Sequence, residues 1–229
     1  MENLMAYQQR TSFMWDSLPH EGGIHTSPGL RAKADAEGKL LPFYGDTVIF
    51  TLPPEMIRWL TQVQEDLYAA CGSYLAERLA PDTFHITLHD LHNSSAGWPS
   101  GLPGNQKRAQ TLLSHARDTL PPEVIVRSSC VFSMVNTSIV MGFEPAQDSD
   151  CRVLMSLYKA FQQIRPLGYP LTLHATLAYY RPGGFDEVET ALIRDTLLQL
   201  GRERREWRLR LSELYYATFD SMNHYKVIG

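Results

Sequence analysis

One short pattern, His-x-Thr-Leu, occurs twice in this chain, at 85–88 and at 174–177. The residues around both copies are typical of β-strands, in which successive side chains point to opposite faces. Each strand would therefore present its histidine and its threonine on one face and apolar side chains on the other. The pattern constrains the fold, because both strands need a hydrophobic core on one face and a polar environment on the other.

The aliphatic fourth residue separates these two copies from similar sequences. The segments 25–28 and 92–95 also begin with His-x-Ser, but proline and serine occupy their fourth positions. Two His/Thr pairs that faced one cleft would supply a general base, a general acid and two hydrogen-bond donors. In-line attack on a phosphodiester needs those groups. A pair of half-buried strand histidines without a catalytic role is the alternative at this point.

The composition excludes several classes of protein. The chain has 229 residues, of which 44% are hydrophobic, which suits one sizeable domain or two small fused lobes. A net charge of -4 argues against a non-specific nucleic-acid binder, although a nucleotide or an RNA end remains open as a substrate. Three cysteines without Cys-x-x-Cys spacing argue against a disulfide framework or a thiolate zinc site. Without a visible secretory signal or membrane-length apolar run, we expect a cytoplasmic protein.

Hydrophobic periodicity and Gly/Pro breakers predict the order of elements. We expect an irregular N-terminal extension over residues 1–44 and a single domain over 45–229. Strands are expected at 46–52, 83–89, 124–134, 138–143, 171–180, 206–217 and 225–228, and helices at 53–79, 106–119, 149–165 and 186–200. Each half then has a similar order, with the motif strand after a helix, which predicts a pseudo-duplicated α+β protein.

The two motifs, on strands of an α+β chain of this size, resemble the two-histidine (2H) phosphoesterase superfamily, which includes the LigT-like RNA ligase/cyclic phosphodiesterases. The resemblance covers about residues 45–228. It implies two pseudo-symmetric lobes, each a small, mostly antiparallel sheet flanked by helices, with one motif from each lobe in a central cleft. It also implies that His85 and His174 are the acid/base pair, and that Thr87 and Thr176 bind phosphate oxygens.

The resemblance implies a metal-independent phosphodiesterase that hydrolyses a cyclic phosphate, of the 2′,3′-cyclic type, or a terminal phosphodiester of a nucleotide or RNA. One imidazole would take a proton from water, and the other would protonate the departing ribose oxygen. An ordinary imidazole pKa of about 6.5 would let one ring be neutral and the other charged near neutral pH. No cofactor is required, and we expect a monomer without a stable protein partner or membrane contact. The motifs do not distinguish acid from base, or hydrolysis from ligation.

Four further side chains are candidates for contact with the substrate: His89, Tyr180, Tyr225 and Trp98. His89 would share a strand face with His85, and Tyr180 would share one with His174. Trp98 belongs to a loop rich in Gly and Pro that could cover the site, since loops often carry function. A surface position for the histidine and plain packing for the tyrosines are the alternatives.

Two other function classes remain open. A non-catalytic module could bind a nucleotide or an RNA end in the same cleft, and it would show affinity without turnover. A metal-dependent hydrolase could use His85, His89 and His92, and metal analysis of the purified protein would identify it. On a strand, however, His85 and His89 would lie about 13 Å apart. The glutamate of a helical His-Glu-x-x-His zinc motif is also missing.

Overall fold

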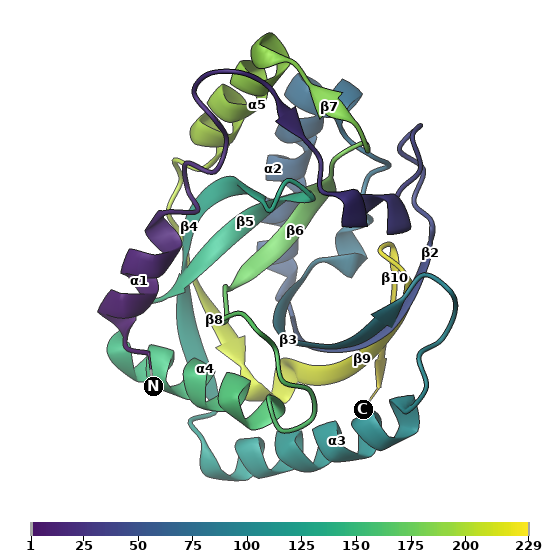
Figure 1. The fold of residues 1–229 in the computed structure, drawn as a ribbon. Coiled ribbons are helices and arrows are strands. Elements are labelled where there is room, and N and C mark those ends of the chain that lie inside the picture. The colour runs from purple at the N-terminus through teal and green to yellow at the C-terminus, as the bar shows by residue number, and fades with distance from the viewer. Residues whose placement is uncertain (1, 229) are drawn as a thin grey trace.

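Two four-stranded sheets form the centre of the computed structural model, which describes residues 2–228 (Figure 1). The first sheet contains, in spatial order, β10 (His224–Ile228), β9 (Leu214–Ser221), β2 (Pro42–Thr51) and β3 (His85–Ser94). The second contains β6 (His174–Tyr179), β5 (Ser138–Pro145), β4 (Glu123–Met134) and β8 (Glu206–Arg210). All neighbouring strands are antiparallel. The motif strands β3 and β6 are therefore edge strands, one in each sheet.

Helices cover the two sheets from opposite sides. The α-helices of the described residues are α1 (Leu4–Ser12), α2 (Pro54–Cys71), α3 (Leu102–Thr119), α4 (Asp148–Phe161) and α5 (Glu187–Leu200). In Figure 1, α3 and α4 run along one side of the molecule, and α2 and α5 lie at the other. The helix α2 connects β2 to β3, and α4 connects β5 to β6. Both motif strands thus follow a helix, and the predicted α+β fold with two lobes is confirmed.

The two halves interlock. The helix α2 follows a strand of the first sheet but contacts β6 of the second, and α4 follows a strand of the second sheet but contacts β3 of the first. The buried apolar side chains form a continuous cluster that draws on both sheets. Among residues 2–228, no helix has the length and apolar character that a membrane crossing requires.

A one-residue bulge interrupts both motif strands at the same point. In β3 the extra residue is Leu88, which directly follows Thr87, and in β6 it is Leu177, which directly follows Thr176. A bulge breaks the alternation of side chains, so the residues beyond it change faces. The matched position of the two bulges is a detailed sign of the pseudo-symmetry between the lobes.

Two element boundaries differ from the expectation for a reason that the contacts explain. The helix predicted over 53–79 ends at Cys71, because Leu75 forms a β-bridge with Tyr180 and Ala76 donates its backbone N–H to Tyr179. The strand predicted over 206–217 is two strands in different sheets, separated by a short 3-10 helix, η4 (Leu211–Glu213). The chain therefore crosses from one lobe to the other at that helix.

The expectation that residues 1–44 are irregular is wrong for much of that segment. It contains α1, a short strand β1 (Ile24–His25) paired with β7 (Gly184–Phe185), and a 3-10 helix η1 (Pro28–Ala32). The helix α1 escaped prediction because it has no apolar stripe: only Tyr7 and Thr11 are buried. Strand β2 begins at Pro42, before the expected boundary of the domain. The division into an extension and a domain from residue 45 stays a prediction.

Candidate active site

Both motifs face one cavity of about 1120 Å³. Its wall includes the four residues of the His/Thr pairs, His85, Thr87, His174 and Thr176. The strands β3 and β6 approach each other with Cα atoms within 8 Å, although they belong to different sheets. All four side chains are half-buried, and the apolar residues between them are fully buried in the core. Strand alternation therefore brings the two pairs together across the boundary between the lobes.

Each motif histidine is held in the same way by a backbone carbonyl two residues before it. The Nδ1 atom of His85 lies 2.6 Å from the carbonyl oxygen of Thr83, and that of His174 lies 2.8 Å from the carbonyl oxygen of Thr172. A carbonyl oxygen can only accept, so Nδ1 of each ring carries a proton. In the neutral ring Nε2 then has a free lone pair. Nε2 is therefore the atom that can accept a proton in the cavity and later deliver it.

Burial disfavours the charged form of both imidazoles. Desolvation is the largest influence on the pKa of His85 and lowers it to about 4, and it also lowers the pKa of His174. The Nδ1 hydrogen bonds and the carboxylate of Asp90 oppose this effect in both rings. Burial therefore opposes the charge that one of the two rings needs for the expected division of roles near neutral pH.

The bulges move two of the predicted contact residues away from the motif face. His89 is 1% exposed, and its ring packs against Tyr158 and Phe161 of α4, with centroids 5.0 and 6.1 Å apart. It touches the cavity wall, but it is neither a surface residue nor a neighbour of His85 on the strand face. Within residues 2–228 its ring nitrogens have no hydrogen-bond partner.

Tyr180 is fully buried and lies outside the cavity wall, packed against Phe185 with ring centroids 5.7 Å apart. Trp98 also lies outside the cavity: it is 52% exposed and its ring contacts Tyr44 at 5.2 Å. Neither placement supports a contact with a ligand in the cavity. Tyr225, in contrast, lines the cavity, and the centroid of its ring lies 4.5 Å from that of His85.

Sequence reasoning missed several cavity residues. Asp90 and Tyr179 stand five positions after the motif histidines, and the bulges turn both toward the cavity. Tyr169 donates its hydroxyl hydrogen to Asp90 at 2.9 Å. Strict alternation could not reveal these residues, because nothing in the sequence marks a bulge at a leucine. Lys33, from the segment expected to be irregular, also lines the cavity.

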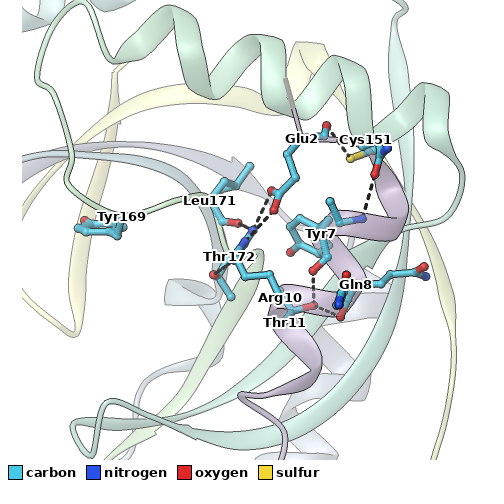
Figure 2. Close-up of polar contacts among 12 residues, drawn as sticks. Glu2, Tyr7, Gln8, Arg10, Thr11, Cys151, Tyr169, Leu171 and Thr172 are labelled. Atoms are coloured by element: carbon cyan, nitrogen blue, oxygen red, sulfur yellow. Dashed lines mark hydrogen bonds and ion pairs between the residues drawn. The ribbon is translucent and has the colours of Figure 1, made fainter.

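The N-terminal helix holds the residues that precede the second motif, and Figure 2 shows Arg10 beside Leu171 and Thr172. Arg10 donates to the carbonyl oxygen of Leu171 at 2.7 Å and to Oγ1 of Thr172 at 3.2 Å. The buried hydroxyl of Tyr7 accepts the backbone N–H of Leu173 at 2.9 Å. Since the carbonyl of Thr172 in turn orients the second histidine, α1 contributes to the geometry of the cavity.

The three histidines of the metal alternative do not converge. His92 uses Nδ1 to accept from Asn105 at 2.7 Å, and its backbone N–H donates to the buried carboxylate of Asp46 at 2.7 Å. His89 is enclosed by aromatic rings of α4. Within the described residues, no group of three or more His, Cys, Asp or Glu side chains is arranged to hold a metal ion. The structure thus offers no ligand set for that alternative.

No family model matches this chain, and no curated protein matches its sequence. Solved structures match its fold. A conserved protein of unknown function from Agrobacterium tumefaciens, ATU0111, has a TM-score of 0.60 and 18% identity, over 90% of this chain and 93% of that chain. TT0787 of Thermus thermophilus has a TM-score of 0.52 and 16% identity, over 80% and 94%. Escherichia coli LigT complexed with 3′-AMP has a TM-score of 0.50 and 13% identity, over 82% and 96%.

The architecture is that of a two-lobed α+β protein with one His/Thr pair from each lobe in a shared cavity. More narrowly, the fold is similar to that of LigT and of the two other solved structures. The two-lobed fold that the paired motifs implied is therefore confirmed. At 13–18% sequence identity, these comparisons show the fold alone.

Proposed function

We propose that this protein is a metal-independent phosphodiesterase that hydrolyses a cyclic phosphate, of the 2′,3′-cyclic type, or a terminal phosphodiester of a nucleotide or RNA. One observation carries the proposal. Two imidazoles in one cavity are each fixed through Nδ1 to a carbonyl oxygen, and each stands beside a threonine. The LigT-like fold supports the same reaction class.

In the proposed reaction, Nε2 of one imidazole takes a proton from water as the water oxygen attacks phosphorus. The bond from phosphorus to the ribose oxygen breaks in line with the attack, and the other ring delivers a proton to that oxygen. The second ring must therefore be charged before reaction. A bound phosphate anion favours this state, because a nearby negative charge raises the pKa of an imidazole. General acid–base catalysis of this kind typically contributes about 10²–10⁴-fold to the rate.

The two threonines have a separate role in the proposal. Thr87 and Thr176 would donate their hydroxyl hydrogens to the non-bridging oxygens of the phosphate, where negative charge must be stabilised during in-line displacement. Their half-buried position beside the imidazoles favours this role, since hydrogen bonds are stronger where water is excluded. Tyr225 would contact the nucleoside, because its ring lies at the cavity wall with its centroid 4.5 Å from that of His85.

The test is the hydrolysis of the four 2′,3′-cyclic nucleotides in excess EDTA, followed by chromatography of the products. We expect activity in the wild type and a loss of at least about 100-fold in His85→Ala and His174→Ala. His115→Ala is the matched control, because His115 is exposed on α3 outside the cavity. Full activity in both cavity variants would refute the proposal. Affinity for the nucleotides without turnover in the wild type would instead identify a binding module.

A further inference from the structure

The cavity contains a cation that the proposed hydrolysis does not use. The Nζ atom of Lys33 lies 5.1 Å from the ring centroid of Phe43 and 5.2 Å from that of Tyr179, so the ammonium is held by two aromatic rings. Within residues 2–228, no carboxylate oxygen lies within 4.0 Å of it. A half-buried lysine in a cavity, with no carboxylate in contact with its ammonium, is a candidate binding group for an anion.

The backbone around Lys33 is firmly held. Its N–H donates to the carbonyl oxygen of Leu30 at 2.8 Å, and its carbonyl accepts from Leu41 at 2.8 Å. The next residue, Ala34, is fully buried and forms a β-bridge with Leu40. The lysine therefore projects from a fixed position of the N-terminal segment, and little conformational freedom of the backbone is lost when it binds a ligand.

A row of aromatic contacts connects the first motif to this lysine. The ring of His85 contacts Tyr225 at 4.5 Å, Tyr225 contacts Phe219 at 5.2 Å, and Phe219 stacks on Phe43 at 6.1 Å. The last of these rings carries the ammonium of Lys33. All of these residues line the cavity. A nucleoside lying on this row would contact His85 at its first ring and Lys33 at its last.

The size and the charges of the cavity fit a substrate with two anionic groups. Its volume of about 1120 Å³ exceeds the range of about 300–1,000 Å³ typical of sites for small organic ligands. The carboxylate of Asp90 lies at the wall formed by β3 and acts on both imidazoles, whereas Lys33 attracts an anion at the wall beside Tyr179. The lysine therefore favours a substrate that carries a second phosphate.

We propose that Lys33 binds a second phosphate group of the substrate while the phosphodiester lies between the two imidazoles. The inference rests on the proposed function for the position of the phosphodiester. It narrows the substrate class to nucleotides or short RNA ends that carry a further phosphate, such as a 5′-phosphate. The aromatic rings around the ammonium exclude part of its water, which strengthens its hydrogen bonds to an anion.

Calorimetric binding of product-like ligands tests this inference without any turnover. Adenosine 3′,5′-bisphosphate is compared with adenosine 3′-phosphate, and a diadenylate 3′-phosphate with a 5′-phosphate is compared with the same ligand without it. We expect the wild type to prefer the 5′-phosphorylated member of at least one pair by about 10- to 100-fold. Lys33→Met should abolish the preference, Lys33→Arg should restore part of it, and Lys39→Met, an exposed change outside the cavity, should retain it.

Three results would overturn the inference: no preference in the wild type for either pair, no binding of any of these ligands, or equal weakening of both members of a pair in Lys33→Met. The last result would place the lysine at the phosphate that both ligands share. A thermal unfolding curve for each variant separates these outcomes from a loss of fold. A lysine-dependent preference without hydrolysis would leave the inference standing and refute only the proposed function.

Discussion

At the level of single residues, burial and hydrogen bonding act in opposite directions on the pKa of the two cavity histidines. Both rings use Nδ1 to donate to a carbonyl oxygen, and desolvation lowers the pKa of both. The carbonyl bonds favour the charged form, since a second proton on Nε2 leaves the Nδ1 donor in place. The burial and the hydrogen bonds thus oppose each other, and a bound anion shifts the balance toward the charged ring.

We expect ligand binding to be coupled to proton uptake. The probe is adenosine 3′-methylphosphate, a diester whose single charge does not change between pH 5 and pH 8. In the free protein the pKa of His85 is lowered to about 4, and the bound anion raises the pKa of the ring that it contacts. The affinity for the diester should therefore rise as the pH falls below the pKa that this ring has in the complex, by up to about tenfold per pH unit. It should become constant below the pKa that the same ring has in the free protein.

Calorimetry in two buffers with different ionisation enthalpies measures this proton uptake directly. The double variant His85→Asn, His174→Asn should bind the diester without taking up a proton. An affinity that stays constant from pH 8 to pH 5, with equal heats in the two buffers, would contradict the electrostatic account of the cavity.

At the level of elements, the helix α1 acts on the second motif through the residues that precede it. Arg10 is held against Glu2 at 2.8 Å and reaches the carbonyl oxygen of Leu171 and the hydroxyl of Thr172. The carbonyl of Thr172 fixes the ring of His174. Arg10 is therefore a positioning residue, although it lies in the segment for which the sequence predicts no regular structure.

Arg10→Met should reduce kcat by about 10- to 100-fold with little change in KM, because a small displacement of a reacting group is costly while the rest of the cavity still binds substrate. Steady-state kinetics with a 2′,3′-cyclic nucleotide measure both constants. Arg10→Lys should recover part of kcat, and Arg152→Met, which removes an exposed ion pair with Asp148 on α4, should behave like the wild type. A rise in KM at unchanged kcat would show that α1 acts on binding instead.

A buried carboxylate holds the end of strand β3. Asp46 is 1% exposed and accepts the backbone N–H of His92 at 2.7 Å, the side-chain amide of Asn105 at 2.8 Å and the hydroxyl of Tyr216 at 3.0 Å. These donors come from β3, α3 and β9, so one side chain connects three elements of the first lobe. None of them belongs to the cavity wall.

Asp46→Ala should lower the free energy of unfolding by about 3–5 kcal/mol, because it leaves three donors without their acceptor inside the protein. Asp46→Asn should cost less, since the amide oxygen still accepts. Urea unfolding followed by circular dichroism gives these values, with the exposed Asp118→Ala as the control. We expect the rate per folded molecule to change little in Asp46→Asn. A loss of stability no larger in Asp46→Ala than in the control would show that the network is not a structural support.

At the level of the whole molecule, the pseudo-symmetry could be predicted from the sequence, but its local irregularities could not. The repeated motif and the order of helices and strands were sufficient to predict two lobes and a shared His/Thr face. The bulges at Leu88 and Leu177 carry no sequence mark, since leucine is as common in regular strands as in bulges. Because of the bulges, Tyr179 lies at the cavity wall in place of the expected Tyr180, and the ring of His89 packs against α4.

Long-range contacts account for the other differences. The residues 206–217 have the alternation of one strand, but the turn at η4 sends its two parts to different sheets, and only the pairing with β4 and β2 decides this. The surroundings of Lys33 depend on aromatic rings of two different sheets, Phe43 from β2 and the distant Tyr179 from β6. Periodicity reports one buried face of an element, and it contains no information on which distant side chain closes a cavity.

The pseudo-symmetric arrangement leads to a prediction about the two lobes together. If one imidazole must accept a proton while the other delivers one, the two rings act as a unit, and removing either one disables the pair. The double variant His85→Ala, His174→Ala should then be about as slow as the slower single variant, with a loss of about 10²–10⁴-fold rather than the product of two such losses.

Rates under single-turnover conditions in excess EDTA are the appropriate measurement, because they separate the chemical step from product release. Thr87→Ala and Thr176→Ala provide the comparison. Each hydroxyl would bind a different oxygen of the same phosphate. The loss of rate in the double threonine variant should therefore be close to the product of the losses in the two single variants. Multiplied losses for the histidine pair would contradict this prediction, because they would mean that the two imidazoles contribute independently to the rate.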